Sequence, residues 1–227
     1  RGEAVALIGE SGSGKSVTLR TLLRLHPERR TRIGGQVQVA GRDVLAMPAR
    51  ELDDFRGKVA SMIFQEPLLA LDPVYSVGAQ IVESIRRHES VSKAEAHQRA
   101  LALFERVRIP SPERRLAAYP HEMSGGMRQR AMIALALACK PQLLLADEPT
   151  TALDATVQIQ ILLLLRELQR DLGLSVIFVT HDIGAAVEVA DRIAVMYAGR
   201  IVEEGTAREL IRSPRHPYTI ALLKSRA

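Results

Sequence analysis

A glycine-rich segment near the start of the chain has the composition of a phosphate-binding loop. It matches the pattern G-x-x-x-x-G-K-[S/T], follows an apolar run predicted as a strand and opens a predicted helix. Glycines let main-chain amides turn toward phosphate oxygens, and a helix N-terminus adds about half a positive charge. We expect Lys15 to reach the β- and γ-phosphates of a nucleotide and the Ser16 hydroxyl to hold magnesium. The segment consists of Gly9, Glu10, Ser11, Gly12, Ser13, Gly14, Lys15 and Ser16.

Two adjacent carboxylates follow a short apolar run later in the chain. The run Leu143–Ala146 is predicted as a buried strand, and Asp147 and Glu148 come directly after it. Ligands of open parallel sheets bind at the carboxyl ends of strands. Asp147 could therefore hold magnesium through water, and Glu148 could act as a general base, a role that typically contributes about 10²–10⁴ in rate. The alternative is an acidic pair that caps a helix, but a phosphate loop in the same chain favours the nucleotide site.

Three further groups have weaker signals when each is taken alone. Ser124, Gly125 and Gly126 precede an apolar helix and form a second helix start that could receive an anion, although a plain capped helix is the alternative. One nucleotide does not need two such helix starts from one subunit. His181 and Gln65 each follow a predicted strand, and single residues of these types are more often structural than catalytic.

Short apolar runs alternate with longer helical patterns, which predicts an α/β fold with a mostly parallel sheet. The predicted strands are Ala4–Ile8, Gln36–Val39, Val59–Phe64, Leu143–Ala146, Leu174–Val179, Arg192–Met196 and Arg200–Val202. The predicted helices are Gly14–Leu25, Gly78–Arg87, Lys93–Val107, Gly125–Cys139 and Ala155–Arg170. Residues 75–135 contain no predicted strand, so we expect a helical lobe inserted between strands of the sheet.

Composition excludes several classes of protein. The chain has 227 residues, 47% hydrophobic and 25% charged, which are globular values. Its longest apolar run, Ala131–Cys139, is nine residues, whereas a membrane-spanning helix needs about 20. The single cysteine, Cys139, excludes an internal disulfide framework and a four-cysteine metal cluster, and we expect it to fill core space. The net charge of +5 is carried largely by residues 84–130, as solvated helix faces or as a surface for an acidic partner or anionic lipid.

Taken in order, these motifs resemble those of the nucleotide-binding subunit of an ABC transporter: phosphate loop, glutamine, Ser-Gly-Gly, Asp-Glu and histidine. The resemblance implies a P-loop NTPase fold, with a mostly parallel central sheet, a small antiparallel β portion and an inserted α-helical subdomain. It implies one domain over residues 1–227, with core segments 1–74 and 136–227 around a subdomain at about 75–135. It also implies binding of ATP and Mg2+, with ATP hydrolysis.

The resemblance assigns a role to each motif. Gln65 would begin a loop that senses the membrane subunit, and it would join Ser16 and Asp147 at the magnesium ion or its water. Glu148 would be the base, and His181 would contact the γ-phosphate and position water. Ser124, Gly125 and Gly126 would bind the γ-phosphate of ATP held by a second subunit, with Asp154 in the loop that crosses the interface. An aromatic residue stacks on adenine upstream of the phosphate loop in this family, and we expect it to lie outside this chain.

A finer resemblance is to the importer branch for peptides, nickel and similar cargo. It is carried by the segments 64–67, 71–74, 123–130 and 215–219, although methionines stand at 123 and 127 where the common signature has leucine and glutamine. The branch implies two transmembrane permease subunits, a second ATP-binding subunit (identical or related) and, indirectly, an extracytoplasmic solute-binding protein. It implies a peripheral position on the cytoplasmic face of the inner membrane.

Two other functions remain open at this point. A soluble ABC-type ATPase acting on nucleic acid or ribosomes would suit the basic charge, although we expect no nucleic-acid partner because base-stacking aromatics are few. A P-loop kinase for a small molecule would leave the Ser-Gly-Gly motif without a role. Because Arg1 stands only three residues before the first predicted strand, we also expect the chain to be truncated at its N-terminus.

Overall fold

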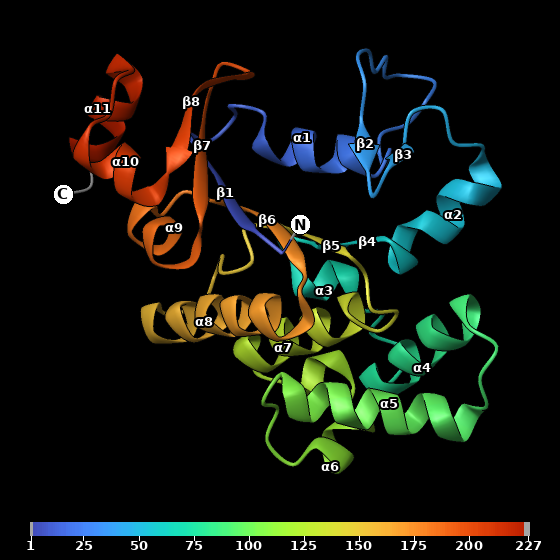
Figure 1. Cartoon of the computed structure of the whole chain (residues 1–227). Coiled ribbons are helices and arrows are strands. Elements are labelled where there is room, and N and C mark those ends of the chain that lie inside the picture. The colour runs from blue at the N-terminus through green and yellow to red at the C-terminus, as the bar shows by residue number, and fades with distance from the viewer. Residues whose placement is uncertain (1, 225–227) are drawn as a thin grey trace.

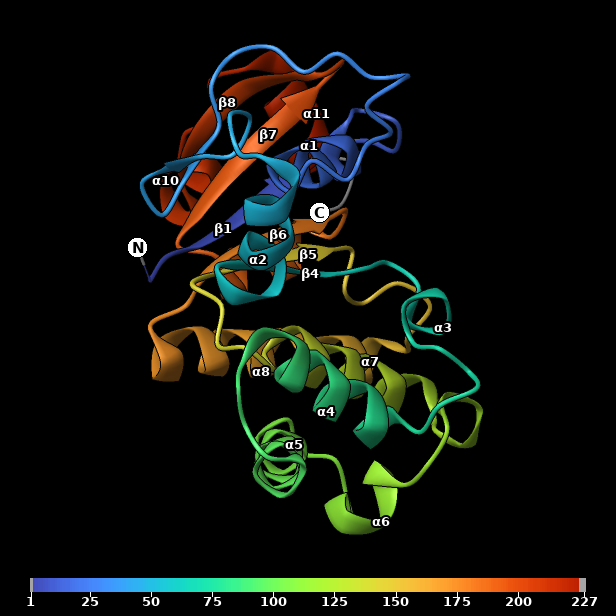
Figure 2. The ribbon, with the colours of Figure 1, turned by 90° about the vertical axis from the view of Figure 1, so that its right-hand side faces the viewer.

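The computed structural model describes residues 2–224, apart from the side chains of Leu68 and Leu69. Its centre is a six-stranded sheet in the order β4-β5-β6-β1-β7-β8 (Figures 1 and 2). All neighbouring pairs are parallel except β7 and β8, which pair antiparallel. A separate antiparallel pair, β2-β3, completes the strands. Their bounds are β1 Ala4–Ile8, β2 Gln38–Val39, β3 Arg42–Asp43, β4 Ala60–Ile63, β5 Leu143–Asp147, β6 Ser175–Thr180, β7 Arg192–Tyr197 and β8 Arg200–Thr206.

Helices cover both faces of this sheet. Figure 1 shows α1 on one side of it and α7 and α8 on the other, with α4, α5 and α6 further out. The first six helices are α1 Lys15–Leu22, α2 Ala49–Lys58, α3 Pro67–Ala70, α4 Val77–His88, α5 Lys93–Arg106 and α6 Pro112–Leu116. The others are α7 Gly125–Ala136, α8 Ala155–Leu172, α9 Ile183–Val189, α10 Ala207–Arg212 and α11 Pro217–Lys224.

Successive residues of the central strands enter two different cores. On β5, Leu144 belongs to the core under α7 and α8, whereas Leu145 belongs to the core under α1 and α2. Both are fully buried. Side chains alternate between the faces of a strand, so a strand covered on both faces must be apolar throughout. This explains why apolar and polar residues do not alternate in the run Leu143–Ala146.

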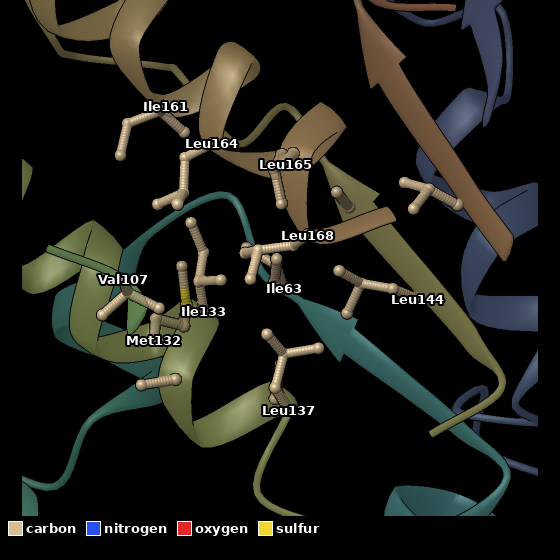
Figure 3. Close-up of a cluster of buried hydrophobic side chains, with 14 of the residues drawn as sticks. Ile63, Val107, Met132, Ile133, Leu137, Leu144, Ile161, Leu164, Leu165 and Leu168 are labelled. Atoms are coloured by element: carbon tan, nitrogen blue, oxygen red, sulfur yellow. The ribbon is translucent and has the colours of Figure 1, made fainter. Parts of the chain in front are cut away.

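The larger core joins the sheet to the helices of residues 77–136. Figure 3 shows Ile133 of α7 and Leu165 of α8 directed toward Ile63 of β4 and Leu144 of β5. The starts of α4, α5 and α7 are capped by the side chains of Ser76, Ser92 and Ser124, which accept amide hydrogen bonds from the first turn. Good caps and a shared core explain why helices form over this basic stretch.

The predicted α/β class and the mostly parallel sheet are confirmed, but several boundaries were wrong. The first helix ends at Leu22 rather than Leu25, because Arg24 adopts a left-handed conformation at φ 49°. The helix predicted to reach Cys139 ends at Ala136, so this buried cysteine lies beyond it. The last strand runs on to Thr206 because it pairs with the whole of β7. The apolar and helical patterns of the sequence did not predict the short elements β3, α2, α3, α6, α9, α10 and α11.

Within residues 2–224, none of the helices combines the length and the apolar character that a bilayer span requires.

We predict that Ile133→Ala destabilises the fold by about 2–5 kcal/mol, because it empties a fully buried position between α7, α8 and the sheet. The matched control is Leu163→Ala on α8, whose side chain is 53% exposed and which should change stability by less than about 0.5 kcal/mol. Urea denaturation gives both free energies of unfolding, and equal values for the two variants would contradict this description of the core.

Candidate functional site

Four adjacent strands end at one edge of the sheet, and each is followed by a predicted site residue. β1 runs into the phosphate loop (residues 9–16), β4 is followed by Gln65, β5 ends in Asp147 before Glu148, and β6 is followed by His181. Because these strands are parallel and neighbours in the sheet, their carboxyl ends meet at the same edge. Parallel pairing therefore brings together residues that are up to 172 positions apart in the sequence.

The phosphate loop lies against the turn between β7 and β8. Gly9 has φ 155°, and a side chain there would collide with the carbonyl oxygen of Met196. The Gly199 amide donates a hydrogen bond of 3.0 Å to the Ser13 carbonyl. On its outer side, the Tyr218 hydroxyl of α11 accepts a hydrogen bond of 2.9 Å from the Glu10 amide. The loop is thus supported by the C-terminal part of the chain as well as by β1 and α1.

The inner side of the loop has free hydrogen-bond donors. The main-chain amides of residues 11, 12, 14, 15 and 16 donate no hydrogen bond within residues 2–224. The Ser13 hydroxyl is buried and also has no partner in that part of the chain. Converging donors at the start of an eight-residue helix fit an anion, as predicted for a phosphate loop.

Lys15 is folded back onto the loop. Its ammonium donates to the carbonyl oxygens of Gly9 and Glu10, at 2.9 and 2.8 Å. Burial lowers the pKa of Lys15, while the negative charges of Glu148 and Asp147 oppose that shift. The lysine is therefore a buried cation held by two carbonyls and available to a stronger acceptor such as a phosphate oxygen.

Asp147 and Ser16 form a pair that fits a divalent cation. The Ser16 hydroxyl donates a hydrogen bond of 2.6 Å to one carboxylate oxygen of Asp147. The other oxygen accepts no hydrogen bond from any residue between 2 and 224, although the side chain is only 1% exposed and Arg20 lies 4.0 Å away. A buried carboxylate oxygen without a hydrogen bond beside a hydroxyl is a hard oxygen donor set, which suits Mg2+. No group of three or more His, Cys, Asp or Glu side chains among the described residues could by itself hold a metal.

Two other loops and a residue of its own loop meet at Glu148. Its carboxylate accepts hydrogen bonds of 3.2 Å from Gln65 and 2.9 Å from Thr151, and His181 Nδ1 lies 3.8 Å away. Glu148 itself adopts φ 46°, a left-handed conformation that costs about 1–3 kcal/mol and is concentrated at functional sites. The family resemblance grouped Glu148, Gln65 and His181 in one site, but it did not indicate the contact with Thr151, which begins the loop that leads to Asp154.

The Ser-Gly-Gly segment lies in a different part of the molecule. No hydrogen bond or ion pair among the described residues joins it to the phosphate loop. A side chain at Gly126 would come within 2.9 Å of Val157 in α8, and one at Gly125 within 3.3 Å of Leu153. Asp154 caps α8 by accepting the Val157 amide at 3.0 Å. The two glycines therefore allow the start of α7 to approach the start of α8.

Comparison with known proteins is consistent with this geometry. Residues 1–151 match the family described as "ABC transporter". A probable peptide ABC transporter ATP-binding protein of Sinorhizobium fredii is 53% identical over 99% of this chain and 67% of its own length. The oligopeptide transport ATP-binding protein of Bacillus subtilis is 51% identical over 99% of this chain, which spans 63% of that relative. A putative peptide import ATP-binding protein of Brucella melitensis is also 51% identical, over 98% of this chain and 67% of its own length.

Solved structures resemble the fold. The ATP-binding cassette MJ0796, in a dimeric post-hydrolysis state with ADP and phosphate, has a TM-score of 0.80 and 31% identity. The match covers 91% of this chain and 86% of that one. The cassette cbiO1 of Clostridium perfringens, part of the transporter complex cbiONQ, also gives 0.80, with 26% identity over 94% of this chain and 80% of its own.

We predict that Gly126→Ala lowers the melting temperature, because the added methyl group would press on Val157, a stiff β-branched side chain. Gly125→Ala is the matched control, since it meets the flexible end of Leu153 and gains helix propensity of about 1 kcal/mol. Combining Gly126→Ala with Val157→Ala should recover part of the loss. Thermal unfolding of these three variants and of Val157→Ala alone tests this, and additive effects of Gly126→Ala and Val157→Ala would refute the contact.

Proposed function

Since the chain belongs to the ABC transporter family, we propose that it is the ATP-binding and ATP-hydrolysing subunit of an importer for di- or oligopeptides or related small solutes. The observation that carries this proposal is the meeting of Gln65, His181 and Thr151 at the Glu148 carboxylate, beside a loop of free amides. That arrangement suits attack by water on a terminal phosphate.

Each residue at this edge of the sheet has a distinct role in the proposed hydrolysis of ATP. The amides of the phosphate loop, with Lys15, bind the phosphates of ATP and align the terminal phosphate. Glu148 accepts a proton from the attacking water, and Gln65 and His181 hold the carboxylate and the water in place. Ser16 and Asp147, with Gln65, would hold Mg2+, which neutralises negative charge on the phosphates when bound.

The Ser-Gly-Gly segment has no role in a site made by one chain. We assign Ser124, Gly125 and Gly126, together with Asp154, to the nucleotide site of a second ATP-binding subunit. A cassette similar to this chain has been solved as a dimer with ADP and phosphate, which supports pairing. Only in the dimer would the terminal phosphate be contacted by both subunits. ATP would therefore bind the closed dimer more tightly than the separate subunits and would favour its formation.

A groove between the sheet and the helical lobe could receive a membrane subunit. It has a volume of about 540 Å³ and includes Phe64, Tyr75, Glu83, Arg87 and Cys139 among its lining residues. The side chains of Phe64 and Tyr75 are 38% and 57% exposed. Exposed aromatic side chains that line one groove are typical of a surface that binds a partner. Phe64 of the groove directly precedes Gln65 in the chain, so a permease segment seated there would be coupled to the Glu148 carboxylate through the Gln65 side chain.

We place the subunit at the cytoplasmic face of the inner membrane, peripherally, with two transmembrane permeases and a second cassette. A solute-binding protein outside the membrane would deliver cargo. We treat residues 75–135 as the helical subdomain of a single ATPase domain over 1–227. An ATPase acting on nucleic acid or ribosomes is not favoured, because the relatives and solved structures reported above are named as transporter components.

We predict that Glu148→Gln keeps ATP affinity within a small factor but slows hydrolysis at least about 100-fold, because an amide cannot accept the proton. Lys15→Ala is the contrasting variant, since it removes a phosphate contact and should weaken binding itself. Phosphate release and nucleotide titration separate the two effects. Near-normal turnover by Glu148→Gln would remove Glu148 from the role of base.

We also predict that the full-length tagged protein, captured from detergent-solubilised membranes, brings two permeases and a second ATP-binding subunit, identified by mass spectrometry. Tyr75→Asp in the groove should reduce permease recovery, because it places a charge in an apolar contact. Ile211→Asp on α10, at a side chain 46% exposed and outside the groove, is the matched control. Recovery of ribosomal or DNA-repair proteins without a permease would overturn the transport function.

A further inference from the structure

The phosphate loop has one side-chain contact that the ATPase mechanism does not use. The Tyr218 hydroxyl accepts a hydrogen bond of 2.9 Å from the amide of Glu10, the second residue of the loop. The two residues are 208 positions apart. Burial raises the pKa of Tyr218, so the phenol stays neutral and its oxygen is available as an acceptor.

This contact holds one edge of a peptide group whose other edge is held by Lys15. The Gly9 carbonyl and the Glu10 amide belong to the same planar peptide. Lys15 donates to the Gly9 carbonyl at 2.9 Å, and Tyr218 accepts from the Glu10 amide on the opposite side. When Lys15 turns to a phosphate oxygen, Tyr218 becomes the only one of these two side chains still fixing that peptide.

Tyr218 is itself held firmly in place. Glu203 of β8 accepts the amides of Arg215 and His216 at 2.8 and 3.0 Å, which anchors the start of α11. His216 Nδ1 accepts the Tyr218 amide at 3.1 Å. The Tyr218 ring packs against Tyr197 at the end of β7, with ring centres 4.5 Å apart. Because these contacts fix the position of Tyr218, its hydroxyl can in turn fix the position of the Glu10 amide in the loop.

We propose that Tyr218 is a positioning residue for nucleotide binding, which holds the Gly9–Glu10 peptide so that the following amides of the loop face the phosphates. This inference rests on the proposed ATP-binding function. The Tyr218 contact uses the Glu10 amide, which is not one of the free amides of the loop, so those amides stay available to phosphate. It therefore contributes most when Lys15 has left the Gly9 carbonyl, and so favours the nucleotide-bound state.

The test is Tyr218→Phe in the full chain, compared with Tyr197→Phe. Both variants keep an aromatic ring, but the Tyr197 hydroxyl makes no hydrogen bond within residues 2–224, so only the first variant loses a contact of the loop. Loss of one neutral hydrogen bond should raise the Kd for ATP by about 2- to 10-fold. The KM for ATP should rise by the same factor, with kcat at saturating ATP unchanged.

A second variant tests the contacts that hold Tyr218 in place. Glu203→Ala frees the start of α11 and should also raise the Kd for ATP, and combining it with Tyr218→Phe should add little, because both act through one contact. An unchanged Kd in Tyr218→Phe, or a fall in nucleotide-free Tm with no change in Kd, would overturn the proposal. If the unaltered chain binds no ATP, the proposed function fails instead, so the two failures are distinguishable.

Discussion

The site depends on the parallel pairing of four neighbouring strands. β4, β5, β6 and β1 lie side by side and run in the same direction, so the residues that follow them are delivered to one edge of the sheet. Both faces of these strands are buried under helices, which fixes their register through two separate cores. A shift of one residue in β5 would exchange Leu144 and Leu145 between those cores and would carry Asp147 away from Ser16. The chemistry at the edge is therefore as well determined as the packing of the sheet.

Charge balance at this edge comes from a small number of buried groups. Lys15 is a buried cation near two carboxylates, of which Asp147 is almost fully enclosed. Removing one of these charged groups leaves the charges of the others buried without an opposite charge. Their contribution to the free energy of folding is therefore not a sum of pairwise contacts. Within residues 2–224, the free amides of the loop and the Ser13 hydroxyl have no acceptor. These donors fit an anion that comes from a bound ligand.

The sequence was sufficient to predict the class of fold and the strands of the sheet, because apolar runs mark strands. The grouping of Gln65, Glu148 and His181 in one site was implied by the resemblance to ABC transporter subunits. The individual contacts within and between the motif segments could not be predicted. Thr151 donates a hydrogen bond to Glu148, which adopts a left-handed conformation, and the Tyr218 hydroxyl accepts one from the Glu10 amide across 208 positions. Short helices such as α9 and α10 offer too few turns for a periodic pattern to be recognised.

The close approach of α7 and α8 links the Ser-Gly-Gly segment to the sheet. A side chain at Gly126 would collide with Val157, so the start of α7 packs directly on α8. α8 has 18 residues, so it is about 27 Å long, and its far half reaches the beginning of β1. There Arg166 binds Asp191, whose carboxylate accepts the Ala4 amide at 2.8 Å. The Ser-Gly-Gly segment is therefore connected to the strand that ends in the phosphate loop by packing on α8 and by the contacts of Asp191 with Arg166 and Ala4.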